Sequence, residues 1–287
     1  MSAKLLTGLP RSGTTLICAC LNELPDCIAL VEPMTLPTPG DIPRLMGAID
    51  AFIADTRKRA LTEGKTRTKT TENTLAFTNT FAEPTREGVL RREVTSISDV
   101  AINKQLTPDF ALFIKYPNLF MAVWEQLQER FPVYGVVRHP LAVLASWQTV
   151  DTYVRDGHVP VVEAYVPALK RELAAIAAPL DRQLVLLRWY FGNFDAFPRK
   201  RVIRYEDLTA DPAGTLAQLH PKRAPIKIVI REEPPDKRHP SVDVALLARR
   251  LLPLAPHFKK FYPDFAESLS RYISPGAALA KIGETNV

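Results

Sequence analysis

The 287-residue sequence has few cysteines and no long apolar run, and these absences exclude several classes of protein. Its three cysteines, Cys18, Cys20 and Cys27, form no CxxC pair, so neither a zinc site nor a disulfide framework is expected. Buried free thiols of a reducing compartment are the simpler interpretation. No apolar stretch is long enough to span a bilayer, and a strand-like segment begins almost at Met1. We therefore expect a cytoplasmic protein with no secretory signal and no membrane partner.

Neither sign of charge forms a block, although the net charge is +6. Basic residues are spread along the chain and interleaved with acidic ones, which argues against a nucleic-acid partner. A small polyphosphorylated ligand fits this distribution better. Hydrophobic residues make up 46% and charged residues 24%, as in ordinary globular proteins. We expect a single domain over residues 1–287.

Apolar strand patterns alternate with helical ones along most of the chain. Strands are expected at 5–8, 27–31, 110–117, 133–137 and 201–205, and helices at 14–24, 118–129, 140–147, 162–177 and 182–197. This alternation predicts an α/β fold of three α/β/α layers around a central parallel sheet. Residues 35–107 are polar and proline-punctuated, and we interpret them as an insertion over the sheet that shapes an acceptor site.

The stretch GLPRSGTT at residues 8–15 lies between the first strand and the first helix. Gly8, Gly13 and Thr15 keep the spacing of the triphosphate loop GxxxxGK[ST], but Thr14 stands in place of the lysine. A glycine loop that leads into a helix directs backbone N–H groups at an anion, and Arg11 adds a fixed cation. The alternative is a plain strand-to-helix turn with Ser12 as N-cap.

A second anion site is predicted in VVRHPLAVLAS. Arg138 ends a strand, Pro140 suits the first position of a helix, and Ser146 lies about two turns into it. Arg138 and Ser146 could therefore reach one anion near the start of that helix. The alternatives are a solvated strand terminus for the arginine and a helix-packing hydroxyl for the serine.

Together, GLPRSGTTL, VVRHPLAVLAS and RYEDL resemble the sulfotransferase family, whose donor is 3′-phosphoadenosine 5′-phosphosulfate (PAPS). The resemblance implies the P-loop-like sulfotransferase fold of soluble, bacterial-type members, and sulfuryl transfer without a metal that leaves 3′,5′-adenosine bisphosphate (PAP). It assigns the 5′-phosphosulfate to Arg11, Ser12, Gly13, Thr14 and Thr15, the 3′-phosphate to Arg138 and Ser146, and a donor contact to Tyr205. A late donor-binding segment is expected near 231–239, with Lys237 and Arg238 as candidates.

The resemblance also suggests catalytic residues. In phenol and steroid sulfotransferases a histidine base follows the strand lysine; here Lys115 is kept, but Pro117 stands in that position. Glu32 falls at the spacing of the glutamate in tyrosylprotein sulfotransferases. We therefore predict Glu32 as the general base, with Lys115 and Arg11 beside it. Burial would raise the pKa of Glu32 and the two cations would lower it, and a salt-bridging Glu32 is the alternative.

The class of the acceptor stays open at this point. Lys65, Arg67 and Lys69 alternate with threonines, so an extended segment would present all three on one face, to an anionic acceptor or to solvent. A hydroxyl or an amine could receive the sulfuryl group. Two other functions compete: a phosphotransferase that uses ATP and magnesium, and a non-catalytic module that binds adenosine bisphosphate.

Overall fold

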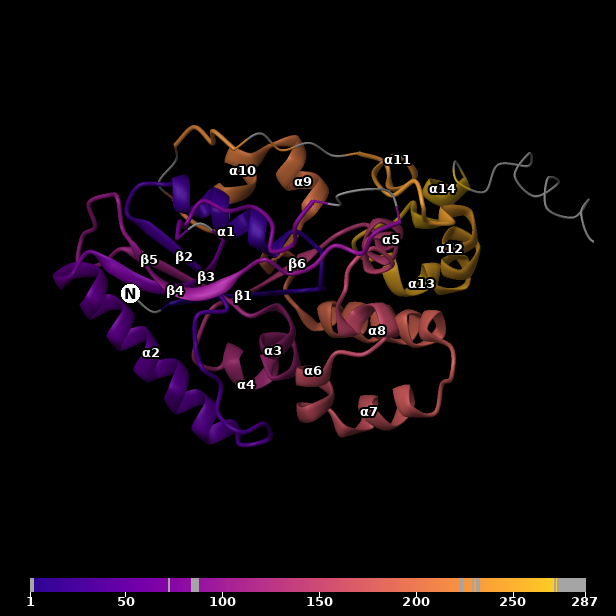
Figure 1. The fold of residues 1–287 in the computed structure, drawn as a ribbon, viewed down its shortest axis with the longest axis horizontal. Coiled ribbons are helices and arrows are strands. Elements are labelled where there is room, and N and C mark those ends of the chain that lie inside the picture. The colour runs from indigo at the N-terminus through magenta and orange to yellow at the C-terminus, as the bar shows by residue number, and fades with distance from the viewer. Residues whose placement is uncertain are drawn as a thin grey trace, which may run out of the picture.

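The computed structural model describes residues 3–71, 73–83, 88–221, 224–228, 230, 233–270 and 272 (Figure 1). Within this part of the chain, parallel strands form one five-stranded sheet in the order β2-β5-β1-β6-β7. The strands are β1 (Lys4–Gly8), β2 (Cys27–Val31), β5 (Ala111–Lys115), β6 (Val133–Val137) and β7 (Val202–Arg204). Each overlaps a predicted strand, which confirms the central parallel sheet.

The strand order determines where a ligand can bind. From β1 the chain continues to β2 on one side of the sheet, whereas from β6 it continues to β7 on the other side. β1 and β6 are neighbours, and Gly8 at the end of β1 pairs with Val136 near the end of β6. Ligands of open α/β sheets bind outside the carboxyl ends of two such strands. The loop that follows β1 and Arg138, which follows β6, both lie at the carboxyl ends of these two strands.

Helices cover both faces of the sheet and make three layers (Figure 1). One face carries α1 (Thr14–Glu23), α9 (Tyr205–Ala210) and α10 (Pro212–Ala217), and the other carries α3 (Pro117–Ala122), α4 (Trp124–Gln128) and α8 (Pro179–Ala196). Alternate strand residues enter the two cores: Leu5 packs in one and Leu6 in the other. This alternation explains why the strands are apolar throughout, as sheets buried on both faces require.

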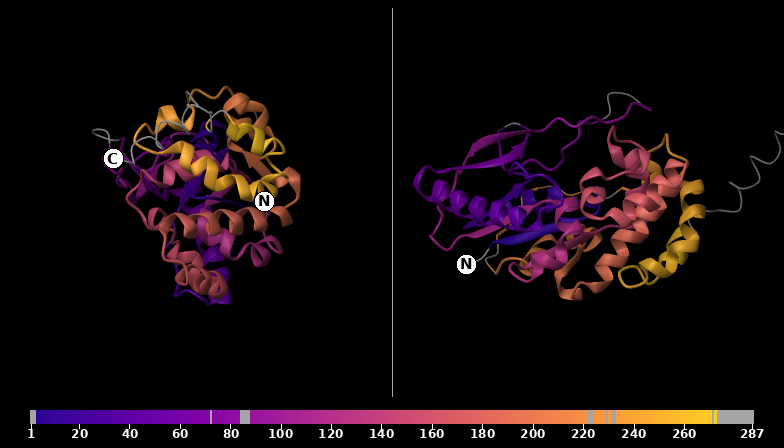
Figure 2. Two further views of the ribbon diagram at one scale, coloured as in Figure 1. Left: turned by 90° about the vertical axis from the view of Figure 1, so that its right-hand side faces the viewer. Right: turned by 90° about the horizontal axis from the view of Figure 1, so that it is seen from below.

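The remaining helices lie around these layers. They are α5 (Pro140–Trp147), α6 (Pro160–Tyr165), α7 (Pro167–Ala174), α11 (Pro235–Arg238), α12 (Val244–Leu251), α13 (Ala255–Phe258) and α14 (Phe265–Ser270), with 3-10 turns at Tyr153–Asp156, Arg199–Arg201 and Leu252–Leu254. The helix predicted over 162–177 is divided, because Pro167 starts a new helix after Val166, whose φ of −124° is not helical. Figures 1 and 2 show α12, α13 and α14 together at one end of the molecule.

The segment 35–107 contains more regular structure than its sequence pattern indicates. It forms α2 (Ile42–Thr62) and an antiparallel hairpin of β3 (Lys65–Thr70) and β4 (Ser96–Ala101), at the opposite end from α12 to α14 (Figure 1). The 21-residue α2 was not predicted. Only Leu45, Met46, Ile49, Thr56 and Ala60 are buried on it, so its apolar stripe is thin. The Asp41 carboxylate caps it by accepting a hydrogen bond from the Arg44 N–H at 2.9 Å.

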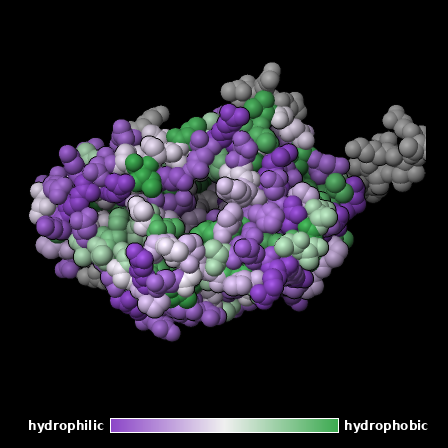
Figure 3. All heavy atoms as spheres, turned by 60° about the horizontal axis from the view of Figure 1, so that its bottom comes forward, coloured by the Kyte–Doolittle hydropathy of each residue, from purple (hydrophilic) through white to green (hydrophobic). Residues whose placement is uncertain are grey.

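No helix in the described part of the chain is long and apolar enough to cross a membrane. Figure 3 shows a largely hydrophilic face on which hydrophobic residues form small groups around a hollow. Cys18, Cys20 and Cys27 are buried free thiols, as expected. Burial raises the pKa of each thiol to about 12, so these side chains are unreactive core residues.

Candidate active site

The loop between β1 and α1 has its own geometry at the start of the helix. Gly13 is the N-cap of α1, with φ of +93° and no side-chain cap, so the alternative role of Ser12 as N-cap is wrong. The Ser12 Oγ is buried and has no hydrogen-bond partner among the described residues. A Cβ on Gly13 would come within 2.4 Å of the Tyr205 ring, so glycine is needed there. The uncapped N–H groups that begin α1 suit an anion.

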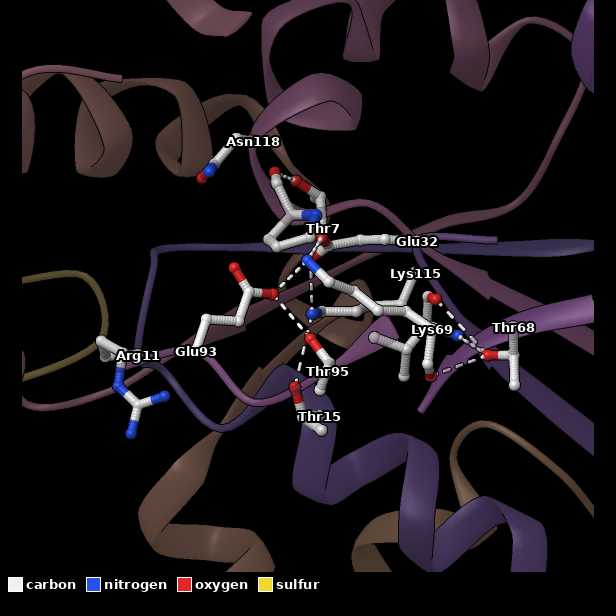
Figure 4. A network of polar contacts seen from close by, with 12 residues as sticks. Thr7, Arg11, Thr15, Glu32, Thr68, Lys69, Glu93, Thr95, Lys115 and Asn118 are labelled. Carbon is white, nitrogen blue, oxygen red and sulfur yellow. Dashed lines mark hydrogen bonds and ion pairs between the residues drawn. The ribbon is translucent and has the colours of Figure 1, made fainter. Parts of the chain in front are cut away.

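Arg11 turns away from the other predicted catalytic residues. Its Nε donates to the Ser146 Oγ at 3.3 Å, its Nη1 donates to the Asn79 Oδ1 at 3.2 Å, and its guanidinium stacks on the Phe81 ring at 4.6 Å. Figure 4 shows the side chain apart from Glu32 and Lys115. Arg11 has φ of +69°, which is unusual for a residue with a side chain. Such backbone strain is typical of functional sites.

Ser146 contacts two members of an arginine cluster, which we define by the mutual repulsion of its charges as Arg11, Arg91, Arg138 and Arg238. The Arg91 Nη2 donates to the Ser146 Oγ at 3.3 Å and to the Thr149 Oγ1 at 2.7 Å. Arg138 stacks on the Tyr205 ring at 4.1 Å, and its buried Nε has no partner among the described residues. Arg238, one of the two candidates near 231–239, belongs to this cluster and lines the cavity into which the cluster opens. Lys237, the other candidate, does not line that cavity. Arg231 lies outside the described residues.

Two pKa shifts report the positive potential of the arginine cluster. Burial, together with the charges of Arg91, Arg138 and Arg238, lowers the pKa of Arg11 to about 9, and Glu83 opposes this shift. Burial and the four arginines of the cluster lower the pKa of His239 to about 3. Cations that repel one another inside a protein favour an anion between them.

Glu32 is held by two lysines in a second cluster, which we define as Glu32, Lys69, Glu93 and Lys115 (Figure 4). The Lys115 Nζ donates to the Glu32 Oε1 at 2.9 Å and to the Thr15 Oγ1 at 3.3 Å. The Lys69 Nζ donates to the Glu32 Oε2 at 3.1 Å and is paired with Glu93. Glu32 follows β2 with φ of +42°, and its N–H donates to the Lys115 carbonyl at 2.8 Å. The backbone therefore fixes the carboxylate beside Lys115.

The structure resolves the opposing influences on Glu32. Burial raises the pKa of its carboxyl, but the charges of Lys115 and Lys69 and their hydrogen bonds outweigh burial and lower the pKa to about 2. The side chain is 28% exposed. Glu32 is thus an ionised carboxylate at neutral pH, and it makes the salt bridges that were its alternative role.

The arginine cluster and the Glu32 cluster open into one cavity of about 580 Å³. The predicted site residues that line it are Arg11, Gly13, Thr14, Thr15, Glu32, Lys115, Arg138 and Tyr205, while Ser12 and Ser146 are buried behind the lining. Within the described residues, no group of three or more His, Cys, Asp or Glu side chains is arranged to hold a metal ion. The cavity brings together the two predicted anion sites.

The segment 35–107 supplies part of the cavity wall. Lys69, Asn79, Phe81 and Glu93 line the cavity. In β3 the threonines are buried and Lys65, Arg67 and Lys69 share the other face, as the alternation predicts. Of these three cations only Lys69 lines this cavity, so the group does not act together there.

Arg91 is the functional candidate that the sequence interpretation missed. Its N–H donates to the Thr149 carbonyl at 2.9 Å, and the Asp151 N–H donates to the Arg91 carbonyl at 2.9 Å. This short parallel bridge joins the segment to the chain after α5. No local motif marks Arg91, because its place depends on a contact with residues about 60 positions away.

The fold and this cavity define an α/β protein with a cluster of cations at the carboxyl ends of its strands, and comparison with known proteins identifies its family. A model of the sulfotransferase family matches residues 5–221, and the chain belongs to that family. Among solved structures it is similar to the sulfotransferase domain from the curacin biosynthetic pathway, at 13% identity and a TM-score of 0.34 over 82% of this chain and 76% of that one. No curated protein matches.

Proposed function

We propose that this chain transfers a sulfuryl group from PAPS to a hydroxyl or amine of an acceptor and leaves PAP. The observation that carries the proposal is a single cavity lined both by three arginines of the cluster, Arg11, Arg138 and Arg238, and by Glu32 and Lys115. PAPS has a phosphate at the 3′ position and a phosphosulfate at the 5′ position, so it requires two anion sites within one cavity. Membership of the sulfotransferase family supports a transferase.

Two buried polar atoms support an anionic ligand. The Ser12 Oγ and the Arg138 Nε lack partners among the described residues, and a buried group left unsatisfied costs about 1–3 kcal/mol. Residues Ser12 to Thr15 at the start of α1 would hold the 5′-phosphosulfate. Arg138, Arg91 and Ser146 would hold the 3′-phosphate, and Tyr205 would contact the nucleoside.

Arg11 has two candidate roles, and its contacts favour one of them. The sequence assigned it to the 5′-phosphosulfate and to catalysis. Its hydrogen bond to Ser146 and its repulsion from Arg91 and Arg138 favour the 3′-phosphate instead. We therefore assign Arg11 to donor binding and leave catalysis to Glu32 and Lys115.

The reaction replaces one bond to sulfur by another, in line. The acceptor oxygen bonds to sulfur while the bond between sulfur and the 5′-phosphate oxygen breaks, and the acceptor proton passes to Glu32. Lys115 contacts both Thr15 of the loop and Glu32, so its ammonium would face the negative charge that develops on the leaving oxygen of a donor held by the loop. An anion bound to Lys115 would also weaken the attraction between that lysine and Glu32, which raises the pKa of the base.

The residues around Glu32 favour a neutral acceptor. Lys69 is already paired with Glu32 and Glu93, while Lys65 and Arg67 do not line the cavity. Of the three cations that suggested an anionic acceptor, the one at this cluster is therefore already paired with carboxylates. We propose that 35–107 shapes the acceptor site as part of one sulfotransferase domain, through Lys69, Phe81 and Glu93.

Thermal unfolding with three ligands tests the donor. PAP at one hundred times its dissociation constant should stabilise the protein by about 2.7 kcal/mol, whereas AMP, which lacks the 3′-phosphate, should stabilise it much less. Stabilisation by ATP with magnesium alone would instead support the phosphotransferase. Transfer of labelled sulfate to alcohols, phenols and amines then separates a catalyst from a non-catalytic module that only binds PAP.

A further inference from the structure

A histidine and a glutamate that the proposed chemistry does not use lie in the cavity wall. His158 lines the same cavity as Glu32 and Lys115, and 34% of its side chain is exposed. Its Nδ1 is 3.1 Å from the Oε1 of Glu163 in α6, a carboxylate that is only 11% exposed. The same Oε1 accepts a hydrogen bond from the Val159 N–H at 2.8 Å. Glu163 is therefore fixed, and it fixes the His158 ring.

This pairing determines which nitrogen of His158 is open to a ligand. An ionised carboxylate only accepts hydrogen bonds, so the Nδ1 of the neutral ring carries the proton and the Nε2 carries a lone pair. The hydrogen bonds of His158 within the described residues involve Nδ1 and the backbone N–H, and none involves Nε2. Nε2 is thus left to accept a hydrogen bond from solvent or from a ligand.

His158 lies just before a helix that contacts the segment after Lys115. α6 packs against α3, which starts with Pro117 and Asn118 directly after the strand that carries Lys115 (Figure 1). Pro117 and Asn118 line the cavity as well. The residues that we propose for donor binding come from other parts of the chain, namely the loop after β1, residue 91, the end of β6, α5 and the start of α9.

The wall around His158 is mainly apolar. Val154, Val159, Pro160 and Val161 line the cavity on either side of the histidine in sequence. Asn118, Thr152 and Tyr153 add polar groups to this part of the lining. A few polar groups among apolar side chains are typical of pockets that orient a ligand through hydrogen bonds. The two oxygens of Glu32, in contrast, are both bonded to lysines.

We propose that the His158 Nε2 accepts a hydrogen bond from a second hydroxyl of the acceptor, and that the acceptors of this chain are therefore diols with an apolar frame. His158 determines specificity, and Glu163 is a positioning residue that holds its ring. The inference rests on the proposed function, because a second hydroxyl matters only when the first one attacks sulfur beside Glu32.

Matched alcohols test this inference. Transfer from labelled PAPS is measured to phenol and the three benzenediols, and to cyclohexanol and its 1,2-, 1,3- and 1,4-diols, which differ only in the second hydroxyl and its spacing. The wild type should prefer at least one diol by about tenfold in kcat/KM, the effect of one hydrogen bond. His158→Ala should remove that preference by lowering kcat/KM about tenfold more for the preferred diol than for the mono-alcohol, and the PAP affinity should stay unchanged.

Two further variants separate a contact from a packing effect. His158→Gln keeps a carbonyl acceptor and should retain part of the preference. His257→Ala, at an exposed position on α13, should behave like the wild type. Glu163→Gln should increase the fraction of His158 protonated at Nε2, as measured by nitrogen-15 NMR, and should weaken the diol preference.

Several outcomes would overturn the inference. These are equal rates with mono-alcohols and diols in the wild type, no transfer to any diol, or an unchanged diol preference in His158→Ala. Each can occur while PAP binds and PAPS is consumed. Failure of the wild type to bind PAP would instead overturn the proposed function, and the inference with it.

Discussion

The arginine cluster and the Glu32 cluster open into one cavity, but they balance their charges in opposite ways. Arg11, Arg91 and Arg138 repel one another, and a buried nitrogen of Arg138 has no partner among the described residues. In the Glu32 cluster two lysines alternate with two glutamates, and each carboxylate contacts a lysine. The first cluster is suited to an added anion, whereas the second is complete without one. Ligand affinity should thus depend on the first cluster and turnover on the second.

The sharpest test of this division is Glu32→Gln. Turnover should fall by about a hundredfold to ten-thousandfold, because the variant loses the group that removes the acceptor proton. The affinity for PAP, measured by calorimetry, should stay within about twofold of the wild type, since the four arginines of the cluster and the loop remain. Glu125→Gln, at an exposed position on α4, is the matched control and should alter neither quantity. Equal turnover in Glu32→Gln and the wild type would refute Glu32 as the base.

Substitution in the arginine cluster should produce the opposite pattern. Arg138→Gln should weaken PAP binding by about a hundredfold, because a hydrogen bond to a charged group contributes about 1.5–3 kcal/mol. Arg91→Gln should weaken it by about tenfold, since three arginines remain. The affinity for AMP, which lacks the 3′-phosphate, should change little in either variant. If AMP and PAP lost affinity equally, these arginines would not form the 3′-phosphate site.

A smaller effect is expected in the dependence of stability on pH. The pKa of Glu32 is lowered to about 2, from about 4.5 for a free carboxyl. A depressed carboxyl pKa stabilises the folded state above the unfolded value, and this contribution is lost as the pH falls toward the folded value. It should therefore decrease between pH 6 and pH 3 by about 2 of its roughly 3 kcal/mol.

Chemical unfolding of the wild type and Glu32→Gln at both pH values measures this change. The difference between the two free energies of unfolding should be larger at pH 6. A difference that did not change with pH would show that the lysines do not hold Glu32 in solution as they do in Figure 4.

The sequence predicted those parts of the molecule that local chemistry determines. Strands buried on both faces are apolar throughout, so all five strands of the parallel sheet were predicted. The glycine loop and Arg138 could be located because each directly follows a predicted strand. The position of Glu32 in the cavity could be expected because it ends a strand. Its low pKa could not, because Lys69 comes from a hairpin whose place over the sheet has no local signature.

Features that depend on distant contacts were missed. α2 buries only a thin stripe, so its periodicity is weak, and Arg91 reaches Ser146 through a backbone bridge to Val150. The pairing of His158 with Glu163 spans five residues, yet neither residue belongs to a motif of the family resemblance. What makes His158 a candidate is the cavity, which only the folded chain reveals.

The bridge between Arg91 and Val150 limits how the segment 35–107 can be exchanged between related enzymes. Arg91 contacts the donor side, while Lys69, Phe81 and Glu93 of the same stretch lie at the wall of the cavity. A chimera that took this stretch from another enzyme to alter its choice of alcohol would also exchange a residue that we propose for nucleotide binding. Such chimeras should transfer residue 91 together with its partner Thr149, because otherwise a change in acceptor selectivity should be accompanied by a lower affinity for the donor.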